Sequence, residues 1–258
     1  MSEKCRGPNC VSTELVRAHV IPRGFARDLG SDGSNISMSI DKTRIANPQQ
    51  GEFDEHILCA ECDGRFGRLD NYAITVTREF SDEHLPIGER QFEVPNSDSG
   101  EFLRFVLALL WRASVSSRPI FNSIALGKYE DIARDVAFGR RGISDFPQFS
   151  VILTRPRSEY DIDPTGFFTY PKRSAFERGL VSYHFAIGGF RIIAVVDSRP
   201  LPPELTPYLL TEDGPLRGVF QKFETTPEFR AMADMLVADA IRRGVPPWEV
   251  DVRKLRDR

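Results

Sequence analysis

Residues 56–80 read HILCAECDGRFGRLDNYAITVTREF and place two cysteines directly before a helical pattern. Cys59 and Cys62 are separated by two residues, which is the spacing of a metal-binding knuckle. The apolar residues that then recur at helical spacing are Phe66, Leu69, Tyr72 and Ala73. This stretch therefore predicts a knuckle that opens a helix starting near Cys62, despite the glycines at 64 and 67.

The other two cysteines of the chain, Cys5 and Cys10, form a second pair with four residues between them. In a reducing compartment, paired cysteines more often hold a metal ion than form disulfides. Two knuckles together supply the four thiolates of a tetrahedral site, and four protein ligands leave no open position on the metal. We therefore expect a structural Zn²⁺ ion. The alternative is a set of four free, buried thiols.

The segment between the two cysteine pairs contains a histidine with two interpretations. Residues 14–21, ELVRAHVI, are expected to form a strand that carries His19 and is ended by Pro22. A short helical turn is expected over residues 24–30, and a short strand over residues 36–40. Taken alone, His19 is best interpreted as a core histidine that packs beside the zinc site. The alternative is a catalytic role.

The order of these features resembles that of zinc-containing HNH endonucleases. The resemblance rests on Cys5 and Cys10, on His19-Val20-Ile21-Pro22, and on Ile57-Leu58-Cys59-Ala60-Glu61-Cys62-Asp63, so it covers about the first 75 residues. In that family the module is a ββα-metal finger, and the nuclease uses one divalent cation. The resemblance implies a hydrolase that cleaves phosphodiesters, in a setting such as phage defence or mobile-element biology.

The resemblance also implies roles for particular residues. His19 matches the general base that takes a proton from the attacking water. Asp54 matches the position that braces the loop, and Asp63 matches the position that holds the catalytic Mg²⁺ or Mn²⁺ ion. The family usually has a further metal ligand directly before the base, where this chain has Ala18. Asp70, seven residues after Asp63 and on the same helix face, could compensate.

The predicted partner is nucleic acid, chiefly DNA, although the chain as a whole is not basic. The net charge is −3 and the calculated isoelectric point is about 5.9. Residues 1–73 contain nine Lys and Arg against eleven Asp and Glu, so a binding face needs basic residues to cluster in space. The arginines expected to contact phosphates are Arg17, Arg23, Arg65 and Arg68. Alternatively, these arginines pair with acidic residues of the same module.

The rest of the chain predicts a mixed helix and antiparallel-sheet domain. Residues 81–98 are polar and turn-rich, which is typical of a linker or long loop between a module at 1–80 and a domain at 99–258. The expected helices cover residues 101–117, capped by Asp98 or Ser99, 127–138, and 226–244, capped by Thr226 and stopped by Gly244. The expected strands cover residues 149–156, 166–173, 180–187 and 190–197, the last two joined by Gly188-Gly189. This domain would select the substrate or bind a protein partner.

The whole chain is thus predicted to be α+β, with a zinc-stapled ββα-metal finger held by four cysteines and followed by the mixed domain. The first residues lack the apolar segment of a secretory signal, and no apolar run is long enough to span a membrane, so a cytoplasmic protein without membrane contact is expected. The leading hypothesis is an HNH-like endonuclease. The alternatives are an inactive zinc module that binds nucleic acid or protein, and a purely structural zinc module.

Overall fold

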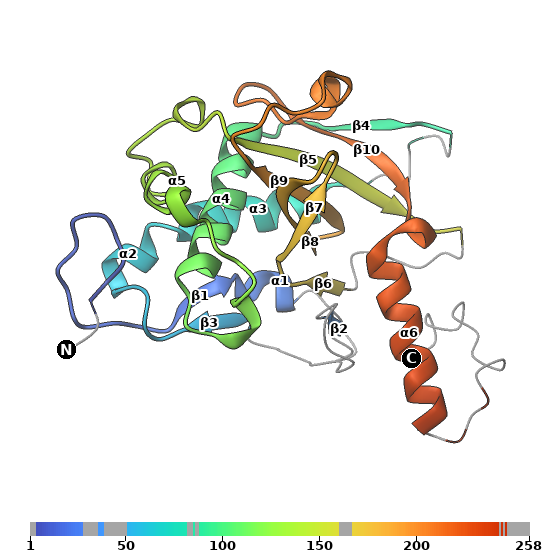
Figure 1. Ribbon diagram of the computed structural model, residues 1–258, viewed down its shortest axis with the longest axis horizontal. Coiled ribbons are helices and arrows are strands. Elements are labelled where there is room, and N and C mark those ends of the chain that lie inside the picture. Colours follow the sequence, from blue (N-terminus) through green and yellow to red (C-terminus); the bar gives the residue numbers. More distant parts are fainter. Residues whose placement is uncertain are drawn as a thin grey trace.

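The computed structural model describes residues 4–27, 36–38, 51–81, 85, 88–159, 167–242, 244 and 246. Figure 1 shows a twisted sheet with a group of helices beside it and a small N-terminal region below them. The chain is therefore α+β, as its pattern of helix and strand signals predicts. Within the described residues, no helix is both long enough and apolar enough to cross a membrane.

The main sheet has six strands in the order β4-β10-β5-β9-β8-β7. Their bounds are β4 Gln91–Val94, β5 Phe149–Arg157, β7 Lys172–Phe176, β8 Leu180–Ile187, β9 Phe190–Val196 and β10 Leu216–Lys222. All neighbours are antiparallel except β10 and β5, which are parallel. The sheet is therefore mixed, which corrects the antiparallel prediction. The reason is that β10 inserts between β4 and β5 and runs in the direction of β5.

The hairpin of β8 and β9 is confirmed and lies within this sheet. Gly188 and Gly189 have φ angles of 57° and 78°, which are the positive values that a type I′ turn requires. Ile187 and Phe190 face each other where the strands meet the turn. Every residue of β9 is buried, because the strand lies inside the sheet and is covered on both faces. The hairpin is thus part of the core.

The predicted strand at residues 166–173 is two separate strands. β6 (Phe167–Thr169) pairs in parallel with β2 (Ile36–Met38), whereas β7 belongs to the main sheet. Pro171 lies between them and cannot donate a hydrogen bond to a ladder, so it separates the two pairings.

The helix predicted over 101–117 is α4, Ser99–Val115, and it is the central helix of the molecule. Asp98 is its N-cap and accepts a hydrogen bond from the Glu101 backbone N–H at 3.0 Å, as predicted. Figure 1 shows α4 between α3 (Gly67–Glu79) and α5 (Glu130–Ala137). Because other elements pack against several sides of α4, apolar residues occur nearly all round this helix.

The N-terminal region contains a short antiparallel pair, β1 (Ala18–Ile21) with β3 (Glu52–Asp54), followed by α2 (Ala60–Gly64). The strand predicted from residue 14 begins only at Ala18, because the Val16 N–H donates to the Leu58 carbonyl instead of to β3. The single helix predicted from Cys62 is two helices, α2 and α3. The break follows from the weak helix propensity of the glycines at 64 and 67.

The N-terminal region and the sheet share one hydrophobic core, which extends from Cys5 and Ala18 to Val196 and Leu216. The predicted linker at 81–98 contains β4, which pairs with β10 at the edge of the sheet. Phe92 and Val94 of β4 are buried, whereas their neighbours in the strand are exposed. This alternation is a strand signal that the polar flanks of the segment concealed.

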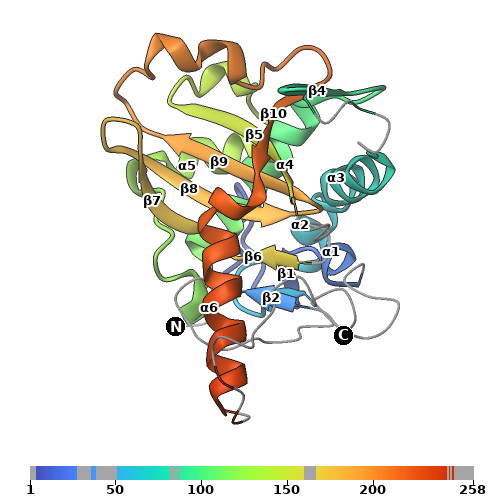
Figure 2. The ribbon, with the colours of Figure 1, turned by 90° about the vertical axis from the view of Figure 1, so that its right-hand side faces the viewer.

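The remaining α-helices of the described residues are α1 (Arg23–Arg27) and α6 (Pro227–Arg242). The Thr226 hydroxyl accepts from the Phe229 N–H at 3.1 Å, which confirms the predicted cap of α6. Gly244 follows the helix with a φ of 75°, which is typical of a helix stop. Figure 2 shows α6 continuing from the end of β10 and extending beyond the sheet.

Candidate functional site

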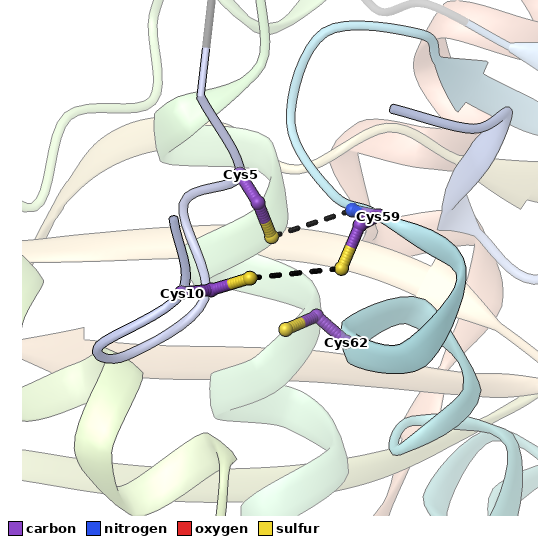
Figure 3. Close-up of side chains that lie close together, drawn as sticks. All are labelled: Cys5, Cys10, Cys59 and Cys62. Carbon is purple, nitrogen blue, oxygen red and sulfur yellow. Dashed lines mark hydrogen bonds between the residues drawn. The ribbon is translucent and has the colours of Figure 1, made fainter. Parts of the chain in front are cut away.

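The four cysteines lie together at the end of the N-terminal region (Figure 3). Their Sγ atoms are all within 4.8 Å of one another, and Cys10 Sγ is 3.7 Å from Cys59 Sγ. A tetrahedral site with Zn–S bonds of about 2.3 Å has sulfur atoms about 3.8 Å apart. The group of Cys5, Cys10, Cys59 and Cys62 (the cysteine cluster) could therefore hold a metal ion.

The first knuckle is shaped by a tight turn at Gly7-Pro8-Asn9-Cys10. The Cys10 N–H donates to the Gly7 carbonyl at 3.2 Å, and Asn9 has a φ of 59°. Proline followed by a residue with positive φ is typical of a type II turn. A Cβ atom at Gly7 would collide with Cys62 Sγ, so only glycine lets the turn approach the second knuckle.

The second knuckle begins α2, because Cys59 is the N-cap residue of this helix. The backbone N–H groups of Gly7 and Cys59 donate to Cys5 Sγ at 3.4 and 3.3 Å. Burial raises the pKa of the Cys59 thiol, but hydrogen bonds from the Cys62 backbone and neighbouring thiols outweigh burial and lower it to about 7. Burial raises the pKa of Cys5 and of Cys62. Metal binding would therefore displace protons from buried thiols.

His19 and Asp63 lie within electrostatic reach of each other. His19 is half-buried in the middle of β1, opposite Phe53 of β3, and Asp63 is a half-buried residue of α2. Burial raises the pKa of Asp63, and the nearby charges of Arg112 and His19 oppose this rise. Among the described residues, none donates a hydrogen bond to the Asp63 carboxylate.

Asp70 has a protein partner where the sequence suggested a metal ion. Arg112 of α4 donates to both Asp70 oxygens at 2.9 and 2.7 Å, and its Nη1 also donates to the His19 carbonyl at 2.8 Å. The Arg112 side chain is only 1% exposed, and its guanidinium stacks 4.9 Å from the Phe66 ring centre. Sequence reasoning missed Arg112. The signal was a charged residue inside a helix that is otherwise apolar nearly all round.

Asp54 is buried and ties two loops together. Its carboxylate accepts from the Ser116 hydroxyl at 2.7 Å, from the N–H and hydroxyl of Ser117 at 2.6 and 3.0 Å, and from the His56 N–H at 2.7 Å. Burial raises the pKa of Asp54, but these hydrogen bonds outweigh it and hold the pKa below its usual value. Asp54 therefore fixes the chain before the second knuckle to the end of α4.

The predicted site residues do not form a second metal cluster. In the part of the chain that the structure describes, the cysteine cluster is the only group of three or more His, Cys, Asp and Glu placed to share an ion. Ala18 is fully buried opposite Asp54 and offers no ligand atom. Asp63 is the predicted ligand whose carboxylate accepts no hydrogen bond from the residues that the structure describes.

Three of the four predicted phosphate contacts are paired with acidic residues. The ion pairs are Arg17 with Glu55 at 3.7 Å, Arg65 with Glu61 at 3.0 Å, and Arg68 with Glu101 at 2.8 Å. Arg17 also stacks on the Phe53 ring at 3.6 Å. Arg23 is exposed on α1, and no ion pair of it is found among the described residues. Exposed pairs of this kind are weak and can exchange for a phosphate.

A serine and histidine on β8 form a contact that resembles a catalytic pair but cannot act as one. Arg191 can only donate, so His184 Nδ1 accepts its hydrogen bond at 3.2 Å and Nε2 carries the proton. Nε2 then donates to Ser182 Oγ at 2.9 Å, and Ser182 Oγ donates to the Ser174 carbonyl at 3.1 Å. The imidazole therefore cannot take the serine proton. Arg191 also binds the buried Glu228 of α6, so this group joins α6 to the sheet.

Comparisons with known proteins identify no relative. No protein-family model, no curated protein and no solved structure matches the chain.

Proposed function

We propose that the chain is an HNH-like, metal-dependent endonuclease that hydrolyses nucleic-acid phosphodiesters, chiefly those of DNA. One observation carries the proposal: the antiparallel pair of β1 and β3 is followed by α2, with His19 on the first strand and Asp63 on the helix. This is the order of a ββα-metal finger. The electrostatic interaction between His19 and Asp63 supports placing both residues in one site.

The ion proposed for the cysteine cluster is structural Zn²⁺. The separations of the sulfur atoms, the burial of three of the four cysteines and the N–H donors on Cys5 Sγ suit a tetrathiolate site. Its role is to fix the first knuckle against α2 and so to hold the segment before β1 near Asp63. Chelating the ion is expected to unfold the N-terminal region, because such sites contribute directly to folding free energy.

His19 is proposed as the general base. His19 is half-buried as a residue, while the hydrogen bond from Arg112 to its carbonyl fixes the strand. The imidazole would take a proton from a water molecule as that water attacks phosphorus. Asp54 would support this geometry by holding the loop after β3 to α4.

Asp63 is the residue proposed to hold a catalytic Mg²⁺ or Mn²⁺ ion. Mg²⁺ is commonly bound through one or two carboxylates together with substrate phosphates, so a single open carboxylate suits this mode of binding. A bound divalent cation would supply stabilisation of the negative charge on the leaving oxygen. Asp70 is paired with Arg112, so Asp63 is the one of these two carboxylates that is proposed to meet a cation.

A second candidate function is a catalytically inactive zinc module that binds nucleic acid or a protein partner. Two observations favour it: Ala18 offers no ligand, and Arg112 engages both oxygens of Asp70. The positive charge of Arg112 also acts on Asp63, and this repulsion disfavours a divalent ion at that carboxylate.

The deciding experiment is nicking of supercoiled plasmid by the zinc-loaded full chain with Mg²⁺ or Mn²⁺. We expect nicking by the wild type and a decrease of roughly 100-fold or more in His19→Ala, because general bases contribute about that much. Asp63→Asn should be inactive or need more metal, whereas Glu79→Gln, an exposed change at the end of α3, should match the wild type.

Two results would contradict this proposal in different ways. A wild type that never nicks DNA or RNA with either metal would eliminate the nuclease and leave the binding module. His19→Ala activity equal to that of the wild type would eliminate His19 as the base.

A further inference from the structure

A surface groove lies beside the first knuckle. It has a volume of about 430 Å³ and is lined by Lys4, Cys5, Arg6, Gly7, Cys10 and Arg134 (the knuckle groove). Arg134 comes from α5, so the groove joins the N-terminal knuckle to a helix far away in sequence. Of its six lining residues, three are basic and none is acidic.

The basic side chains of the knuckle groove differ in whether they form ion pairs with the described acidic residues. Lys4 and Arg6 are exposed, and neither makes an ion pair with any residue that the structure describes. Arg134 does pair, with Asp131 at 3.1 Å and Asp135 at 3.8 Å. Asp135 also pairs with Arg140 and Arg141 at 3.4 and 3.7 Å, so its charge is shared among three arginines. The three basic side chains that line the groove therefore face two acidic partners, Asp131 and Asp135, and the charge of Asp135 is divided.

We infer that the knuckle groove binds phosphate groups of a nucleic-acid backbone. This inference rests on the proposed function, because it takes the ligand to be the nucleic acid on which the chain acts. Arginine presents a planar fork that matches phosphate oxygens, and lysine adds a point charge. Three of the arginines expected from the sequence are already paired, whereas Lys4 and Arg6 have no acidic partner to give up among the residues that the structure describes.

A competing explanation is that these cations only balance the metal centre. Four thiolates around a divalent ion carry a net charge of −2, which nearby basic residues stabilise. That role requires the charges to face the sulfur atoms and predicts an effect on metal retention alone. Phosphate binding predicts an effect on nucleic-acid affinity and on its salt dependence while the metal is retained.

The test compares two double variants of the zinc-loaded full chain. Lys4→Ala/Arg6→Ala removes two exposed basic charges of the groove that make no ion pair with the described residues. Arg178→Ala/Arg217→Ala removes two exposed charges that pair with Glu204 and Glu93, so both variants have the same net charge. Binding of a short fluorescein-labelled DNA duplex is measured by anisotropy over a range of salt concentrations without added Mg²⁺ or Mn²⁺, with zinc content as a parallel readout.

We expect the groove variant to bind more weakly at low salt, with a logarithmic salt slope lower by about two, because each phosphate neutralised by a basic side chain releases about one counterion. The control variant should retain the wild-type slope. Inorganic pyrophosphate should compete only weakly with the DNA, because a groove that binds several phosphates along a DNA strand gains more contacts from DNA than from pyrophosphate. Wild-type affinity and slope in the groove variant, with or without a decrease in zinc content, would overturn the inference.

The nicking assay separates this inference from the proposed function. A wild type that binds the duplex through the groove but never cleaves it would disprove the nuclease and leave the groove assignment standing. Cleavage by the wild type together with unchanged DNA binding in the groove variant would support the nuclease and disprove the groove assignment. A wild type that neither binds nor cleaves nucleic acid would disprove both.

Discussion

The carboxylate of Asp70 on α3 accepts a hydrogen bond through each of its oxygens from the buried guanidinium of Arg112 on α4. The same guanidinium donates to the His19 carbonyl on β1. One side chain thus joins three elements around the proposed site. Arg112 is also the cation that opposes the effect of burial on Asp63.

We expect the stability of the fold to decrease strongly when either partner of the Asp70–Arg112 pair is removed. Asp70→Ala leaves a cation with 1% exposure unpaired, so we expect a decrease of about 3–5 kcal/mol in the free energy of unfolding. The double variant Asp70→Leu/Arg112→Met should lose less than the sum of the single variants, because no charge is left buried. Urea unfolding measures both, and simple additivity would contradict a coupled pair.

The close approach of Gly7 to Cys62 predicts a metal-binding defect from one added methyl group. Gly7→Ala should reduce the zinc content of the purified protein, because the new Cβ collides with Cys62 Sγ. Gly64→Ala is the matched control, because a Cβ atom at this position meets nothing within 4 Å. This variant should keep its zinc, and its free energy of unfolding should rise by up to about 1 kcal/mol because the residue lies in α2. Equal zinc content in the two variants would show that the turn can move away.

The buried carboxylate of Asp54 predicts a loss of stability in acid. Its pKa is below the usual value in the folded chain, so the unfolded state binds a proton at a higher pH than the native state. This stabilisation is fully present above the unfolded pKa and disappears as the pH falls through the folded pKa. Asp54→Asn should therefore be less stable than the wild type near neutral pH, with the difference shrinking in acid. A difference that is independent of pH would count against this account.

His184 predicts a separate pH effect at higher pH. Burial and the Arg191 charge lower its pKa from 6.5 to about 4, so between these values the unfolded chain binds more protons than the native one. Stability should fall as the pH drops from 6.5 towards 4, and His184→Gln should lack this part of the decline. NMR of the imidazole nitrogens provides a direct check, since the neutral ring should carry its proton on Nε2.

The sequence predicted those parts of the fold and site that depend on neighbours in the chain. The glycine pair specifies the β8–β9 hairpin through the backbone angles of two adjacent residues. The cap of α4 at Asp98 depends on a hydrogen bond between residues that are only three positions apart in the sequence. The cysteine spacings likewise predicted a four-thiol cluster, because each knuckle is a local turn.

Features that join distant segments could not be predicted in this way. β4 and β10 carry weak strand signals, and they pair with each other although they lie more than 100 residues apart in the sequence. Asp70 looked like a metal ligand because its helix face was visible from the sequence, whereas its partner Arg112 lies 42 residues further along. Spacing identifies which side chains share a face, but not what packs against that face.

The sequence by itself thus determined the cysteine cluster, the principal hairpin, the helix caps and the α+β class, because short-range hydrogen bonds and backbone preferences specify them. Only the tertiary structure decided that Asp70 pairs with Arg112, that the charges of Arg112 and His19 act on Asp63, and that Lys4 and Arg6 meet Arg134 at one groove. The physical reason is that these relationships arise when the core packs α3, α4 and α5 together, and packing depends on surfaces that no local pattern contains.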